Sequence, residues 1–489
     1  MQRRFAISNS TVVSILHTSF LVVVLSCLEL VDFRDVQTAF ITYTIVTILA
    51  YGSMIYTSKT SSKGWNSYHI FLVLTFAFYF GGQFLVTFGY YEQLADRMFS
   101  VVDQRVTLNA KIQAMNYVLI VLMLINVGYN WKWSKIDFSN TRKKNTTINK
   151  ELILQIAMIL FWITIIPTFI SLGKSVVLSA TLGHLEYRSE KAAETGIWFL
   201  FSYISGWFRP ACFMILLAAE NKRSKIVAYA GLIAYCCLYL MTGSRYQIIE
   251  IAYCVFAINY IWKDKKIKRG NLVKVIILGL VLVTALKAIG YARAVETGAS
   301  IFSIEAIKQV FQENIIYEIF YTTSTTFTTI SNAIMRCPTE IPFNMGKGYL
   351  GALLYILPSS LRPSDMTIFN TDVESVFSSL YYNWTLSGYG SSFVAELYYN
   401  LGVFGILVAP FLGGFMARII GKMECYSNYQ HVYAFYSMIF LFSELLWGVR
   451  SDLFLVPRHM FLYVFIPWIV LKILHNLISK KSGVSYEKK

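Results

Sequence analysis

Apolar stretches long enough to cross a lipid bilayer recur from one end of this 489-residue chain to the other. About 20 apolar residues in a helix span the roughly 30 Å of bilayer hydrocarbon. Hydropathy predicts twelve such spans, at residues 9–30, 37–56, 68–89, 112–130, 152–171, 197–219, 226–242, 246–262, 272–290, 391–416, 432–449 and 459–478. Charged residues make up only 14% of the chain, against about 25% in soluble proteins. The sequence therefore predicts an all-α polytopic integral membrane protein.

Positive charge is concentrated in alternate loops. The loops on the side of both termini hold 24 of the 43 Lys and Arg residues and only six acids, whereas the opposite loops hold 15 bases and 17 acids. Cytoplasmic loops of membrane proteins carry an excess of Lys and Arg, so both termini are expected in the cytoplasm. Topology and anionic lipid headgroups account for the formal net charge of +16. No nucleic-acid partner is needed.

One connection is much longer than the others and is expected on the outer side of the membrane. It joins the ninth and tenth spans, and long loops of this kind are usually functional. The apolar spacing from Ile304 to Ile319 predicts an amphipathic helix, the hydroxyl-rich run from Tyr321 to Thr329 argues against a lipid-facing span, and Gly348 to Leu357 predicts a short surface or re-entrant helix. The chain is thus expected to divide into a nine-span region, a periplasmic loop and a three-span region, at residues 1–290, 291–390 and 391–489.

Aromatic side chains crowd together near the end of this loop, beside amide and hydroxyl groups. Aromatic planes suit the C–H faces of pyranose rings, which favours a sugar-binding role. An interfacial aromatic belt is the alternative. The residues are Tyr381, Tyr382, Trp384 and Tyr389.

Five arginines are placed at the outer ends of predicted spans. The planar guanidinium fork forms two parallel hydrogen bonds to a phosphate and stays protonated. A lipid-linked phosphorylated substrate is therefore one interpretation, and simple snorkelling to lipid headgroups is the other. The five are Arg245, Arg293, Arg362, Arg450 and Arg458.

Further ionisable residues are predicted inside spans. Charge is costly there, so each of these residues is a candidate for a functional role. Arg209 precedes Pro210, which would free backbone carbonyls for its guanidinium, and Glu250 could pair with Arg245. Lys287, Glu396 and Glu444 complete this group. The six histidines show no metal-ligand spacing, and the chain has no GxxxxGK loop. We therefore expect no metal and no other cofactor.

Three stretches resemble the bacterial O-antigen polymerases of the Wzy family, also called oligosaccharide repeat-unit polymerases. They are TGSRYQIIEI at 242–251, LPSSLRPSD at 357–365 and, most specifically, SSFVAELYYNLGVFGILVAPFLGGFMAR at 391–418. GVRSDLF at 448–454 resembles the segment that carries the family's final outer-face arginine. The resemblance implies a glycosyltransferase type-C-like helical fold in the bacterial inner membrane. It also implies undecaprenyl-diphosphate-linked oligosaccharides as substrates, without nucleotide donors.

The reaction that this resemblance implies is transfer of a growing glycan from its undecaprenyl diphosphate onto an incoming lipid-linked repeat unit. The arginines would stabilise the leaving diphosphate without a metal. Glu396, Glu444 and His459 are candidate bases for the acceptor hydroxyl, and a purely structural ion pair is the alternative for each acid. A chain-length regulator and a flippase in the same membrane are possible partners.

Two other functions share parts of this pattern. A lipid-linked oligosaccharide flippase would also have about twelve spans, but it would not need so long an external loop. An O-antigen ligase would share the layout and the donor, but it would transfer the glycan to lipid A core.

Overall fold

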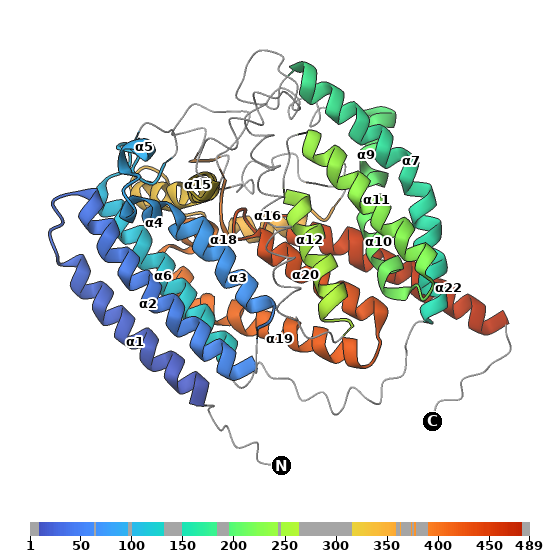
Figure 1. Cartoon of the computed structure of the whole chain (residues 1–489), viewed down its shortest axis with the longest axis horizontal. Coiled ribbons are helices and arrows are strands. Elements are labelled where there is room, and N and C mark those ends of the chain that lie inside the picture. Colours follow the sequence, from blue (N-terminus) through green and yellow to red (C-terminus); the bar gives the residue numbers. More distant parts are fainter. Residues whose placement is uncertain are drawn as a thin grey trace. The chain divides into compact units, whose positions relative to one another are not determined.

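The computed structural model describes residues 9–62, 65–95, 100–131, 149–182, 195–242, 246–263, 315–357, 362, 373, 376–377 and 390–481. Within these ranges every regular element is a helix (Figure 1). Eight helices are long and apolar enough to cross a membrane, and two further helices qualify only as a bent pair. The prediction of an all-α polytopic membrane protein is confirmed.

The eight long helices agree with predicted spans. Three of them consist of more than one element: Ser67–Thr87 joins α3, η1 and α4, Gly196–Ala218 joins α9 and α10, and Val456–Leu477 joins α21, η7 and the start of α22. The others are α1 (Asn9–Glu29), α2 (Val36–Ser62), α6 (Leu108–Asn130), α7 (Lys150–Leu182) and α11 (Lys222–Met241).

The predicted span at 391–416 contains a bend of 87° in the structure. Helix α18 (Phe393–Leu401) ends at Gly402, which has φ +57° and starts the short helix η6 (Gly402–Leu407). Helix α19 (Ala409–Asn428) follows. Glycine tolerates this left-handed conformation. Pro410 lacks an amide hydrogen, and a helix accepts such a residue in its first turn, which is where Pro410 lies in α19.

Three other predicted spans differ or stay open. The spans at 246–262 and 432–449 are shorter apolar helices, α12 (Tyr246–Tyr260) and α20 (Val432–Trp447). The span at 272–290 lies outside the described residues. The count of twelve spans stays a prediction.

Contacts group the chain into two compact units. Unit 1 consists of residues 1–137, 314–421 and 444–456, and unit 2 consists of residues 138–313, 422–443 and 457–489. The division into residues 1–290, 291–390 and 391–489 concerns the membrane arrangement, and it stays a prediction.

Helix α6 lies at the centre of unit 1, where α1 and α2 run beside it (Figure 1). Hydrogen bonds between side chains hold these helices together. Asn126 donates its amide to Thr57 of α2 at 2.9 Å, and Asn130 donates to Ser14 of α1 at 3.0 Å. On another side α6 meets α19 at backbone distance, since a Cβ added to Gly413 would lie 1.9 Å from the carbonyl oxygen of Ile125. Polar bonds and small residues are the usual means of packing membrane helices.

The hydroxyl-rich run from Tyr321 to Thr329 lies in α15 (Ile315–Arg336), which packs against η1 (Phe76–Phe80), α4 (Gly81–Thr87) and α6. Ser324, Thr326 and Thr328 are buried in unit 1, and the expectation that this run does not face lipid stays a prediction. The predicted amphipathic helix at 304–319 lies mostly outside the described residues. A short helix, α16 (Lys347–Leu354), does form within the stretch expected to hold one.

Two buried charges in unit 2 pair with each other. The guanidinium of Arg209 on α10 (Phe208–Ala218) donates from Nη1 to Oε2 of Glu250 on α12, and both side chains are only about 5% exposed. Glu250 was a candidate partner for Arg245, which lies outside the described residues. The structure thus gives Arg209 a carboxylate partner, and its expected pairing with the backbone carbonyls freed by Pro210 stays a prediction.

This pair predicts an asymmetric response to mutation. Arg209→Met or Glu250→Gln alone should lower stability by about 3–5 kcal/mol, because each leaves a buried charge without its opposite. The double variant Arg209→Met/Glu250→Leu should recover most of the loss, since no charge remains buried. Thermal unfolding in detergent checks this. Single variants as stable as the wild type would contradict the role assigned to the pair.

The orientation in the membrane predicts which loops an impermeant thiol reagent reaches. Native Cys337 is a poor reporter because it is 3% exposed and burial raises the pKa of its thiol to about 12. In a cysteine-free background, Thr339→Cys, between α15 and α16, should be labelled from the outer face. Asn428→Cys, at the inner end of α19, should be labelled only after the membrane is opened. The reverse pattern would overturn the orientation.

Candidate active site

Two of the stretches singled out by sequence meet at the start of α18 in unit 1. The backbone N–H of Ser391 donates to the carbonyl oxygen of Arg450 at 3.1 Å, and that of Phe393 donates to the carbonyl oxygen of Gly448 at 2.8 Å. The segment after α20, residues 448–455, therefore lies against the first residues of α18. We call it the 448–455 segment.

The local sequence explains why α18 begins where it does. Gly390 has φ +107°, a conformation that favours glycine, and its carbonyl oxygen accepts a hydrogen bond from the hydroxyl of Thr329 on α15. Ser392 follows in extended conformation and caps the helix, because its hydroxyl accepts from the backbone N–H of Ala395 at 3.0 Å. Glu396 then falls in the first turn, where the helix dipole favours a negative charge.

Glu396 is only 1% exposed, and its carboxylate ties the two stretches together. Its Oε2 accepts a hydrogen bond from the backbone N–H of Leu453 at 2.8 Å. Arg450 lies close by: its Nε would be 3.9 Å from a Cβ placed on Gly390. The structure thus brings a buried acid and a half-buried arginine to the same helix start.

A third segment, α16, is fixed to α18 by asparagine side chains. Asn400 lies one turn after Glu396 and donates its amide to the carbonyl oxygen of Glu396 at 2.9 Å. Its Oδ1 accepts from the Nδ2 of Asn344 at 3.2 Å and from the backbone N–H of Gly348 at 3.3 Å. Burial and the nearby negative charge of Glu396 raise the pKa of the Tyr349 hydroxyl. The bonds of Asn400 therefore hold the first turn of α16 against α18, one turn from Glu396.

Arg362 joins this arrangement through an aromatic ring. Its guanidinium lies 4.3 Å from the ring centre of Tyr355, at the end of α16, and its Nε donates to the carbonyl oxygen of Leu357 at 2.9 Å. The ring of Tyr355 meets that of Phe454 edge to face at 4.6 Å. Phe454 belongs to the 448–455 segment, so α16, α18 and this segment form one cluster. We call it the outer cluster.

The other sequence candidates divide between the units and the undescribed residues. Glu444 is buried in α20, one turn before Gly448, and belongs to unit 1. Arg458 and His459 lie on α21 (Val456–Met460) in unit 2, where the His459 ring is 5.8 Å from that of Tyr463. Six candidates fall outside the described residues: Arg245, Arg293, Tyr381, Tyr382, Trp384 and Tyr389.

Sequence reasoning missed Asn400, Asn344 and Tyr355. A signal for Asn400 was present, because residues four apart share a helix face and Asn400 follows Glu396 by four. The bond of Asn344 to Asn400 and the contact of Tyr355 with Phe454 gave no such signal, since these partners are far apart in the sequence.

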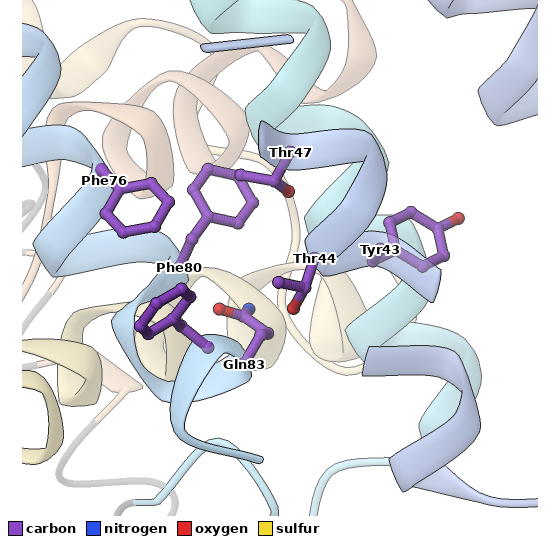
Figure 2. Close-up of a pocket in the computed structure, with 7 residues that line it drawn as sticks. Tyr43, Thr44, Thr47, Phe76, Phe80 and Gln83 are labelled. Carbon is purple, nitrogen blue, oxygen red and sulfur yellow. The ribbon is translucent and has the colours of Figure 1, made fainter. Parts of the chain in front are cut away.

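A separate cleft in unit 1 lies between α2 and the pair η1 and α4 (Figure 2). Phe76, Phe80 and Gln83 line it from one side, and Thr44 and Thr47 line it from α2. Gln83 is 1% exposed, and its amide has no hydrogen-bond partner among the described residues. The space is too narrow for a water molecule, so the cleft does not accommodate a sugar in this conformation.

In the described ranges, no three His, Cys, Asp or Glu side chains lie close enough together to hold a metal ion.

Comparison with known proteins gives one match. The family model described as O-antigen polysaccharide polymerase Wzy matches residues 10–482. No curated protein and no solved structure matches the chain. Because the family model covers nearly the whole chain, and because the apolar helices suit a multi-pass membrane protein, this protein belongs to the Wzy family of O-antigen polymerases, which polymerise lipid-linked oligosaccharide repeat units.

Proposed function

We propose that the protein works at the periplasmic face of the bacterial inner membrane, with both termini in the cytoplasm. It transfers the growing glycan from its undecaprenyl diphosphate onto the sugar of an incoming lipid-linked unit. The observation that carries this proposal is the set of hydrogen bonds that hold the 448–455 segment, which carries Arg450, against the start of α18, which carries the buried Glu396.

The chemistry needs a group that stabilises the leaving diphosphate. As the bond between the donor sugar's C1 and the diphosphate oxygen breaks, negative charge builds up on that oxygen. Arg450 and Arg362 border the outer cluster, and a guanidinium placed beforehand stabilises such charge without a metal ion. Arg245, Arg293 and Arg458 are also proposed to bind diphosphate.

The chemistry also needs a base. The acceptor hydroxyl loses its proton as its oxygen bonds to C1, and the Glu396 carboxylate takes that proton. The hydrogen bond from Leu453 N–H fixes the orientation of this carboxylate, as a general base requires. Glu444 and His459 are the remaining candidates for this role.

The rest of the proposal concerns the sugars and the partners. Tyr381, Tyr382, Trp384 and Tyr389 are proposed to stack on the repeat-unit sugars. A chain-length regulator and a flippase in the same membrane are proposed partners, since one would set the polymer length and the other would supply substrate.

A purified system tests the proposal against its rivals. The protein is reconstituted in lipid nanodiscs and given only undecaprenyl-diphosphate-linked repeat units, without nucleotide sugars, ATP or lipid A core. A polymerase should produce a ladder of products and release undecaprenyl diphosphate. A flippase would leave the units unchanged, and a ligase would require the core acceptor. Unchanged units would contradict the proposed function.

A further inference from the structure

The Tyr355 side chain contacts both Arg362 and the 448–455 segment. On one side its ring faces the Arg362 guanidinium at 4.3 Å, and its carbonyl oxygen accepts from Nη2 of Arg362 at 3.4 Å. On the other side the same ring packs against Phe454, which is buried. The Tyr355 ring thus lies between the arginine and the segment that carries Arg450.

From these contacts we propose that Tyr355 is a positioning residue, which holds the Arg362 guanidinium so that Arg362 and Arg450 bind the same anionic diphosphate. The inference rests on the proposed function. A guanidinium stacked on an aromatic face loses little freedom, while its planar donors remain directed away from the ring. The two bonds to backbone carbonyls, from Nε and Nη2, leave both Nη1 protons available to a phosphate within the described structure.

The contacts specify what the Tyr355 side chain must supply. They involve the ring face and edge, and no hydrogen bond of the Tyr355 hydroxyl occurs among the described residues. Tyr355→Phe should therefore behave like the wild type. Tyr355→Leu removes the aromatic face and should act like a partial loss of Arg362.

The test uses purified Tyr355→Phe, Tyr355→Leu, Arg362→Ala and the double variant Tyr355→Leu/Arg362→Ala. Two quantities are measured: kcat/KM for the lipid-linked repeat unit and the inhibition constant of inorganic pyrophosphate, which probes the anion site directly. Tyr355→Leu should lower kcat/KM about 3- to 30-fold, the range expected for a lost cation–π contact. It should weaken pyrophosphate inhibition by a similar factor. Tyr355→Phe should stay within about twofold, and the double variant should be no worse than Arg362→Ala.

Several results would overturn the inference. These are a Tyr355→Leu protein with normal kinetics, a Tyr355→Phe protein as impaired as Tyr355→Leu, and a further loss when Tyr355→Leu is added to Arg362→Ala. If Tyr355→Leu does not accumulate, Tyr355→Met takes its place in the same comparison. Failure of the proposed function looks different, because wild-type protein would then form no polymer at all.

Discussion

Replacing Arg450 by alanine is expected to abolish the O-antigen ladder while the protein still folds. The Arg450 guanidinium would donate hydrogen bonds to the leaving diphosphate and so stabilise its negative charge. Removing one hydrogen-bond donor of this kind typically lowers turnover roughly 10²–10³-fold. The fold should survive because α18 binds the backbone carbonyl of Arg450, which alanine keeps. Arg450→Lys should rescue only part of the activity, since an ammonium cannot form two parallel hydrogen bonds to a phosphate. A lipopolysaccharide gel, with membrane abundance measured in parallel, checks the result.

Arg105→Ala is the matched control for this experiment. Arg105 is another arginine of unit 1 that is expected on the outer side, but it pairs with Asp103 at 2.8 Å and is well exposed. The Arg105 side chain is exposed and lies outside the outer cluster, so the control should give a normal ladder. A normal ladder from Arg450→Ala would remove Arg450 from the diphosphate site.

Glu396→Gln should lower turnover roughly 10²–10⁴-fold, the usual range for loss of a general base. Glutamine keeps the size of the side chain, and its carbonyl oxygen can still accept from Leu453 N–H, but it cannot take a proton. The lipid-linked donor should therefore still bind and still raise the melting temperature. The measurement combines thermal unfolding, with and without donor, and polymerisation in nanodiscs.

The control for Glu396→Gln is Glu340→Gln, which alters an exposed acid paired with Arg336 within one helical turn. It should leave turnover unchanged within about twofold. A stable Glu396→Gln protein with near-normal turnover would exclude Glu396 as the base and favour Glu444 or His459. A protein that melts far below the wild type would instead indicate that Glu396 is mainly structural.

The sequence predicted which stretches form the candidate site, but it did not predict how these stretches contact each other. Residues 391–418 and 448–454 were both identified from their residues, and both border the outer cluster. Their contact depends on the bond between Glu396 and the Leu453 N–H, 57 positions apart. Nothing local in the sequence specifies such a long-range partner.

The same limit explains two features that the sequence did not show. Hydropathy averages over a window and ignores backbone dihedral angles, so the predicted span at 391–416 gave no sign of the 87° bend. Gly402 and Pro410 were visible in the sequence, but their effect on the helix was not. The bond between Glu250 and Arg209, 41 positions apart, likewise has no local sequence signal, and the suggested pairing of Glu250 with Arg245 stays a prediction.

The central claim is that Glu396 and Arg450 act in one reaction centre, and a kinetic double-mutant cycle tests it most directly. Turnover of lipid-linked repeat units is measured for the wild type, Glu396→Gln, Arg450→Ala and the double variant, all in nanodiscs. Residues that act as a unit have strongly non-additive effects, so the double variant should be hardly slower than the slower single variant. Losses that multiply, or near-normal turnover in either single variant, would contradict a shared centre.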